Sequence, residues 1–231
     1  MFKAIKVIIF DLDGTIFDTR EDIADAVNFA RTRFGKPELT VDKVTSMVGH
    51  GIAILAQEAF EGCGVDSAAA GEAIMEYYTA NPGRKARLYP GVRETISALD
   101  QVLTIVSNKP KILVEALLKE HGLADSFAFV AGGDTFAERK PDPMAVEFIL
   151  KRYGVTRDEV IVVGDHSPDI EMAKRAGVSS VYCNYGFFGD DSVGADLCID
   201  ALDELPGVLA RLTPEDDTLK PQIEPPSHQG H

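Results

Sequence analysis

The feature of this sequence that most constrains its fold is a set of short apolar runs separated by segments with helical periodicity. Three runs, almost free of polar residues, cover residues 7–10, 102–106 and 160–163. A continuous apolar run is typical of a strand buried on both faces of a parallel sheet, because a strand with one exposed face alternates apolar and polar residues. Apolar residues recur every three or four positions, as in amphipathic helices, in residues 92–99, 112–118 and 144–150. The alternation predicts an α/β fold with a doubly wound, Rossmann-like parallel sheet. Weaker strands are expected at residues 127–130, 180–183 and 195–199.

Residues 16–88 interrupt this alternation, because they hold several apolar stripes at helical spacing and no convincing strand. We therefore expect an all-helical cap domain at residues 16–88, inserted between two parts of an α/β core at residues 1–15 and 89–212. Residues 213–231 are polar and rich in proline, with too little apolar surface to offset the entropy of ordering. They are predicted to form a disordered tail.

The composition limits the partners of this chain. Its 231 residues are 45% hydrophobic, which is enough for a sizeable core and a small accessory domain. Lys and Arg total 23 against 37 for Asp and Glu, and a net charge of −14 argues against nucleic acid and membrane surfaces as partners. The three cysteines form no Cys-x-x-Cys pair, and residues 7–10 are too short for a signal peptide or membrane span. A cytoplasmic protein, either monomer or homodimer, is expected.

A pair of acids follows the first apolar run, in the segment Asp11-Leu12-Asp13-Gly14-Thr15. In extended backbone, residues two apart project to the same side, and Gly14 allows a sharp turn after the pair. One carboxylate can then attack phosphorus to form an aspartyl phosphate, while the other exchanges a proton with the leaving oxygen and with water. This interpretation makes Asp11 the nucleophile and Asp13 the acid and base. A calcium-binding EF-hand loop is excluded, because its spacing would require glycine at position 16 and glutamate at position 22.

Two more acids follow the run at residues 160–163. Asp165 comes directly after Gly164, and Asp169 lies one helical turn further on. Ser167 and Pro168 suit the N-cap and the first position of a helix. Carboxylates beside Asp11 suit a hard cation such as Mg²⁺. The simpler alternative, that the helix dipole attracts acids to its N-terminus, accounts for Asp169 but not for Asp165.

Ser107, Asn108 and Lys140 complete the set of candidate phosphate-binding residues. Ser107 and Asn108 follow the run at 102–106, where a hydroxyl and a backbone amide would lie at the ligand-binding edge of the sheet. Ordinary turn chemistry is the alternative for this pair. Lys140 precedes a proline, in a stretch where it could neutralise the charge shared by Asp11 and a phosphate.

At these residues the sequence resembles the haloacid dehalogenase superfamily, over residues 7 to about 209. Within that superfamily it is most similar to the phosphoglycolate phosphatase group, at residues 47–51, 131–135 and 181–186. The resemblance implies Mg²⁺ bound by the Asp11 side chain, the Asp13 main-chain carbonyl and Asp165, with Asp169 nearby. It also implies that the cap selects the substrate. His166 departs from the group, which usually has serine or threonine there. We expect this histidine to be solvated or to lie behind the metal ligands, rather than to bind the metal itself.

The substrate contacts of the cap remain open at this point. Gly49, His50 and Gly51 could form a loop that presents the imidazole and free amides to a carboxylate, or they could be an exposed turn. Other possible cationic partners in this region are Arg20, Lys36, Lys43, Arg84, Lys85 and Arg87.

The sequence therefore predicts a magnesium-dependent phosphomonoester hydrolase that acts on a small phosphorylated metabolite such as 2-phosphoglycolate. The alternatives within the superfamily are a sugar-phosphate mutase, similar to β-phosphoglucomutase, and a pyrophosphatase. A dehalogenase is disfavoured because Asp13 would have no task in it. A phospho-receiver module or a non-catalytic binding protein is the alternative outside enzymes.

Overall fold

The computed structural model describes residues 4–189, 192 and 194–212 and contains one six-stranded sheet in the order β5-β4-β1-β6-β7-β8. Its strands are β1 (Val7–Phe10), β4 (Val102–Val106), β5 (Phe129–Ala131), β6 (Val160–Gly164), β7 (Ser179–Cys183) and β8 (Leu197–Ile199). Each neighbouring pair in this sheet is parallel. The expected doubly wound α/β class is confirmed. The expected disordered tail, residues 213–231, lies outside the described residues.

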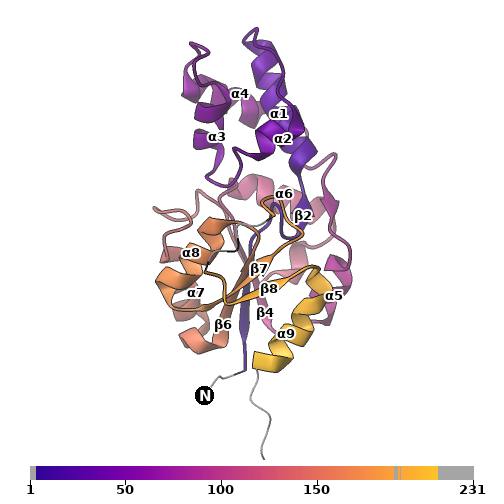
Figure 1. The fold of residues 1–231 in the computed structure, drawn as a ribbon, viewed down its shortest axis with the longest axis vertical. Coiled ribbons are helices and arrows are strands. Elements are labelled where there is room, and N and C mark those ends of the chain that lie inside the picture. The colour runs from indigo at the N-terminus through magenta and orange to yellow at the C-terminus, as the bar shows by residue number, and fades with distance from the viewer. Residues whose placement is uncertain (1–3, 190–191, 193, 213–231) are drawn as a thin grey trace, which may run out of the picture.

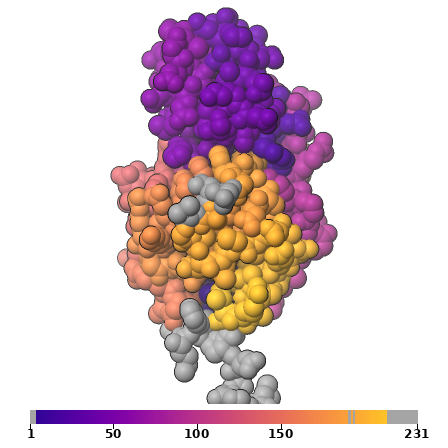
Figure 2. Space-filling view, viewed as in Figure 1, coloured from indigo at the N-terminus to yellow at the C-terminus, as the bar shows by residue number. Residues whose placement is uncertain are grey.

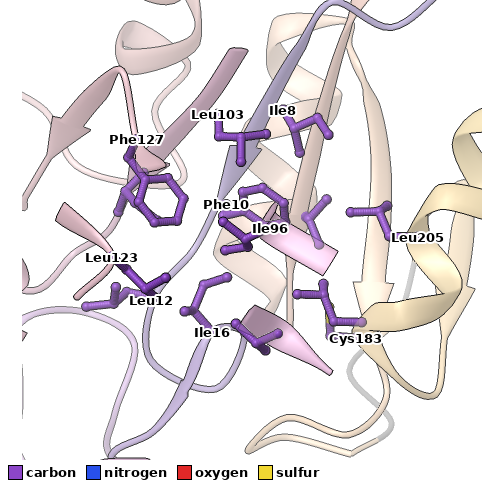
Figure 3. Packing of buried hydrophobic residues seen from close by; sticks show 14 of the residues in the cluster. Ile8, Phe10, Leu12, Ile16, Ile96, Leu103, Leu123, Phe127, Cys183 and Leu205 are labelled. Atoms are coloured by element: carbon purple, nitrogen blue, oxygen red, sulfur yellow. The ribbon is translucent and has the colours of Figure 1, made fainter. Parts of the chain in front are cut away.

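Helices cover both faces of the sheet, which explains why β1 is apolar at every position. The helices of the sheet region are α5 (Val92–Ala98), α6 (Lys111–Glu120), α7 (Met144–Tyr153), α8 (Ser167–Ala176) and α9 (Leu205–Leu212). Val7 and Ile9 point to one face and pack in a cluster with residues of α7 and α8. Ile8 and Phe10 point to the other face, where they pack with residues of α5, α6 and α9 (Figure 3). Figure 1 shows α7 and α8 on one side of the sheet and α5 and α9 on the other.

The register of the central strands brings their carboxyl ends to one edge. Phe10, the last residue of β1, is level with Ile105 of β4 and Val163 of β6. The residues that directly follow β1, β4 and β6 therefore meet at the same edge, and the strand order changes direction between β1 and β6. Such a switch point is where open α/β sheets bind ligands.

Four of the helices between β1 and β4 in sequence gather beyond one end of the sheet (Figure 1). They are α1 (Arg20–Arg33), α2 (Val41–Thr45), α3 (Ile52–Ala59) and α4 (Ser67–Ala80). Thr40 and Asp66 cap α2 and α4, because each side chain accepts a hydrogen bond from a backbone amide of the first turn. Apolar residues of α1, α3 and α4 form a separate buried cluster, which Leu113 of α6 joins. Figure 2 shows this helical part seated directly on the core.

Residues 16–88 also contain two short strands that the sequence did not reveal, so the expectation of an entirely helical segment is wrong. β2 (Phe17–Asp18) and β3 (Arg87–Leu88) pair antiparallel at the two ends of the helical part. Two residues are too few to produce an alternating pattern. The N-cap of α8 is also corrected by one residue, from Ser167 to His166. Within the described residues, no helix combines the length and the apolar character that crossing a membrane requires.

Candidate active site

Three carboxylates converge at the carboxyl ends of β1 and β6. Asp11 follows β1, Asp165 follows β6, and Asp169 lies in the first turn of α8. An oxygen of each lies within 4.8 Å of the others. Asp165 and Asp169 are fully buried, and Asp11 is 8% exposed. The three side chains that the sequence assigned to a cation are thus brought together in one buried group.

The carboxylate of Asp165 is held from two sides. Thr15 Oγ1 donates a hydrogen bond to it at 3.0 Å, and the backbone amide of Phe187 donates another at 2.8 Å. Gly14, at φ +91°, passes so close that a Cβ there would lie 2.1 Å from Asp165 Oδ2. Gly186 also packs against this side chain, since a Cβ on Gly186 would lie 2.2 Å from the Cβ of Asp165. Glycine is required at both positions because the backbone itself packs against the carboxylate.

The electrostatics of this group favour a bound cation. Burial raises the pKa of Asp165 well above its usual value, and the charges of Asp11 and Asp169 raise it further. Burial also raises the pKa of Asp169 to about 7, against the lowering effect of Lys140. Burial alone would lower the pKa of Lys140, but Asp11 and Asp169 reverse the effect and raise it. One lysine therefore does not compensate three buried carboxylates, and an all-oxygen donor set suits Mg²⁺.

Lys140 is fixed among these acids. Its Nζ lies 2.7 Å from Asp11 Oδ1 and 2.6 Å from Asp169 Oδ1. The side chain of Asn108 positions the lysine backbone, since its Oδ1 accepts from Lys140 N at 3.0 Å and its Nδ2 donates to Lys140 O at 3.1 Å. The same Nδ2 donates to Gly49 O at 2.8 Å. Asn108 therefore ties together the end of β4, the lysine loop and the helical part.

Asp13 is separate from the buried carboxylate group and has its own partners. Thr19 Oγ1 donates a hydrogen bond to Asp13 Oδ1 at 2.7 Å. Lys109 Nζ lies 3.1 Å from both carboxylate oxygens. The side chains of Lys109 and Asp13 are only 8% and 11% exposed. Asp13 therefore lies outside the buried group of three carboxylates.

Ser107 occupies the end of the neighbouring strand. It is 5% exposed and lines the same cavity as Asp11 and Lys140. Its Oγ accepts a hydrogen bond from the backbone amide of Lys109 at 3.3 Å. A hydroxyl is therefore available beside Asp11, as expected. The side-chain amide of Asn108 is hydrogen-bonded to backbone groups of Gly49 and Lys140, so the backbone N–H of Asn108 is the group left to bind a ligand.

The cavity lies between the core and the helical part. Its lining residues are Asp11, Asp13, Ile23, Val48, Gly49, Gly51, Ile52, Leu55, Tyr78, Ser107, Asn108, Lys109, Pro110, Leu113, Lys140, His166, Pro168, Asp169 and Phe188. The core supplies the charged groups, whereas the helical part supplies aliphatic side chains, two glycines and Tyr78. The cavity thus has a polar floor and an apolar roof.

The three residues of the cap motif at 49–51 take different positions relative to the cavity. Gly49 and Gly51 line the cavity, but His50 is exposed and lies edge-on to His166, with ring centroids 5.5 Å apart. His166 stacks on Phe188 at 3.9 Å and does not belong to the group of three carboxylates. The six other cations considered, between residues 20 and 87, are all described, and none of them lines this cavity.

Several residues of the site were not identified from the sequence. Thr15 lies in the same segment as Asp11 and Asp13, and Lys109 directly follows Asn108, so their positions indicate the region of the site but not their partners. Thr19, Tyr78 and Phe188 carry no such signal, because only the fold brings them to the cavity or to Asp13.

Comparisons with known proteins agree with this geometry. Residues 8–183 match the model of the haloacid dehalogenase-like hydrolase family. A phosphoglycolate phosphatase of Aliivibrio fischeri is 35% identical over 198 residues, which is 81% of this chain and 87% of that protein. One from Vibrio vulnificus is 36% identical over 221 residues, covering 90% of this chain and 97% of the relative.

Solved structures give the same result. The crystal structure of a predicted phosphoglycolate phosphatase from Haemophilus somnus matches with a TM-score of 0.84 at 27% identity, over 88% of this chain and 97% of the other. A predicted phosphatase from Clostridium acetobutylicum has a TM-score of 0.80 at 21% identity, over 90% and 100% of the two chains, which shows the shared fold. The family model alone covers most of the chain. The protein therefore belongs to the haloacid dehalogenase-like hydrolase family, and it is an enzyme of the phosphoglycolate phosphatase-like kind.

Proposed function

We propose that this protein is a magnesium-dependent phosphomonoester hydrolase that works through an aspartyl phosphate on Asp11. The observation that carries the proposal is the ion pair of Lys140 with Asp11 inside a buried group of carboxylates, under an apolar roof. A small phosphorylated acid is the proposed substrate, and 2-phosphoglycolate is the first candidate because relatives at 35% and 36% identity are named for it.

In the proposed reaction, the Asp11 carboxylate attacks phosphorus, and the bond to the leaving alcohol oxygen breaks as Asp13 protonates that oxygen. Water then attacks the phosphorus of the aspartyl phosphate and gives its proton to Asp13, while the bond between phosphorus and the Asp11 oxygen breaks. This step releases inorganic phosphate and restores the Asp11 carboxylate. Lys140, the Ser107 hydroxyl and the Asn108 amide hold the phosphoryl oxygens. Thr19 and Lys109 support this role of Asp13, since both hold its carboxylate at the edge of the cavity.

The proposed metal ligands are the side chains of Asp11 and Asp165 and the main-chain carbonyl of Asp13, with Asp169 behind them. When bound, Mg²⁺ supplies positive charge to a phosphate that would otherwise meet several carboxylates. The need for it is supported by the cavity itself, whose lining has three carboxylates against two lysines. Thr15 and the Phe187 amide would orient Asp165 toward the ion.

We propose that residues 16–88 act as a cap that excludes water, while residues 1–15 and 89–212 form the catalytic core. The apolar roof disfavours the sugar-phosphate mutase, because sugar hydroxyls would lack hydrogen-bond partners there. The burial of Asp11 disfavours a phospho-receiver module, whose aspartate must be accessible to a partner protein.

Phosphate release from 2-phosphoglycolate, from pyrophosphate and from a sugar phosphate tests the proposal. Purified protein should release phosphate from 2-phosphoglycolate with Mg²⁺ and without a sugar bisphosphate, and EDTA should abolish the release. Faster hydrolysis of pyrophosphate would favour the pyrophosphatase instead. Absence of release from all three in the presence of Mg²⁺ would contradict the proposed function.

A further inference from the structure

The two lysines that line the cavity have different commitments. Lys140 lies within 2.7 Å of both Asp11 and Asp169, at the phosphate end of the cavity. Lys109 pairs with Asp13, at 3.1 Å from each oxygen. An ammonium carries three N–H donors, and two oxygens occupy no more than two of them. Lys109 therefore keeps a donor for another acceptor. Lys140 also keeps one beyond Asp11 and Asp169, but the proposed reaction assigns it to a phosphoryl oxygen.

Lys109 lies where the organic part of a substrate would be. Its partner Asp13 is the proposed proton donor to the leaving oxygen, so the alcohol part of the substrate must lie beside that carboxylate. Its Nζ also lies 4.7 Å from the ring centroid of Tyr78, which belongs to α4 in the roof. The ammonium is thus held at the border between the polar floor and the apolar roof, with its side chain 8% exposed.

The roof offers no competing cation. The lining residues between positions 23 and 78 are aliphatic residues, two glycines and Tyr78. Tyr78 keeps its proton, because burial and the nearby charge of Asp13 raise its pKa. Among the described residues that line the cavity, Lys109 and Lys140 are the lysines, and there is no arginine. Because Lys140 lies at the phosphate end, Lys109 is the cation that an anionic group on the alcohol part of a substrate can reach.

We propose that Lys109 is a specificity-determining residue that binds a carboxylate on the organic part of the substrate. It selects phosphomonoesters of small hydroxy acids over esters of neutral alcohols of the same size. This inference rests on the proposed phosphatase function. A hydrogen bond between a desolvated ammonium and a carboxylate is stronger than one between neutral groups, so the discrimination is expected to be large.

The test compares two esters that differ in charge and little in size: 2-phosphoglycolate and 2-hydroxyethyl phosphate. The readout is the ratio of their kcat/KM values, measured by phosphate release with Mg²⁺. In the unmodified enzyme the ratio should favour the acid. Lys109→Met and Lys109→Gln should lower the ratio roughly 10-fold to 100-fold, mainly through KM for the acid. Lys109→Arg should retain most of it.

The matched control is Lys111→Met, since Lys111 has a side chain that is 42% exposed, pairs with Glu115 at 3.5 Å and does not line the cavity. This variant should leave the ratio unchanged. If Lys109 acted only by positioning Asp13, both esters would slow by the same factor and the ratio would stay constant, which would overturn the inference. A ratio near one in the unmodified enzyme would overturn it as well. A protein that hydrolyses neither ester would instead defeat the proposed function.

Discussion

Thermal unfolding should depend on pH and on Mg²⁺ together, because two buried carboxylates lie beside Asp11. A carboxyl group whose pKa is higher in the folded protein than in the unfolded chain binds its proton more tightly when folded. Its contribution to stability is complete below the unfolded value and is lost as pH rises through the folded value. For Asp169 this stabilisation is lost as the pH rises from 3.8 to about 7. The raised pKa of Asp165 likewise makes stability fall as the pH rises.

The size of the effect follows from the shift of Asp169. A change in pKa from 3.8 to about 7 corresponds to a stability difference on the order of 4 kcal/mol between the two ends of the window. For a protein of this length, that is roughly 10 °C in melting temperature. Lys140 adds nothing to the change, since its raised pKa keeps it charged throughout. Mg²⁺ competes with protons for the same oxygens, so it should stabilise the ionised form of the group most.

The assay is a melting curve in EDTA and in Mg²⁺, at about pH 5 and at about pH 7.5. The gain in melting temperature from Mg²⁺ should be larger at the higher pH. Burial lowers the pKa of His121, so the contribution of this residue to stability increases as the pH rises. The comparison between Mg²⁺ and EDTA at the same pH removes this contribution. Asp169→Asn should have a smaller pH dependence in EDTA. An equal gain at both pH values, or no gain at all, would refute the reasoning.

Three further substitutions test separate parts of the site. Asp13→Asn should slow the hydrolysis of alkyl phosphates by about 10²-fold or more, and that of p-nitrophenyl phosphate much less, because only poor leaving groups need the proton. Equal slowing of both substrates in steady-state assays would count against Asp13 as the acid. Gly14→Ala should lower the free energy of unfolding in urea by roughly 2–5 kcal/mol and weaken the response to Mg²⁺, since a Cβ there would clash with Asp165. The control Gly35→Ala, at a similar positive φ but with open space around it, should lower it by about 1 kcal/mol. Asn108→Ala should lower the free energy of unfolding by about 1–3 kcal/mol and raise KM, because it removes the hydrogen bonds to the Lys140 backbone and to Gly49 O. An unchanged unfolding midpoint and KM would show that these hydrogen bonds are dispensable.

The sheet and its acids could be predicted because each depends on a local pattern. The run at residues 7–10 is apolar throughout because helices cover both faces of β1, and that condition is visible in the residues themselves. Asp11 and Asp165 could then be placed together, since parallel strands of equal register end at one edge.

The remaining features depend on contacts between distant segments. Lys109 looks like one solvated lysine among many until the turn after β1 brings Asp13 to it. Thr19 contacts Asp13 from the residue after β2, a strand that pairs with the distant β3, and two-residue strands leave no periodic signal. Residues 49–51 could form either a loop that presents groups to the substrate or an exposed turn, and their sequence does not tell which side faces inward. The fold turns its glycines to the cavity and His50 to the surface.

The most direct test of the central claim is to stop the reaction with acid during turnover of 2-phosphoglycolate and to identify the modified peptide by mass spectrometry. We expect one phosphoryl group on Asp11, absent without Mg²⁺ and absent in Asp11→Asn, which should also lose turnover. A phosphoryl group on another residue, or undiminished steady-state hydrolysis by Asp11→Asn, would contradict the account.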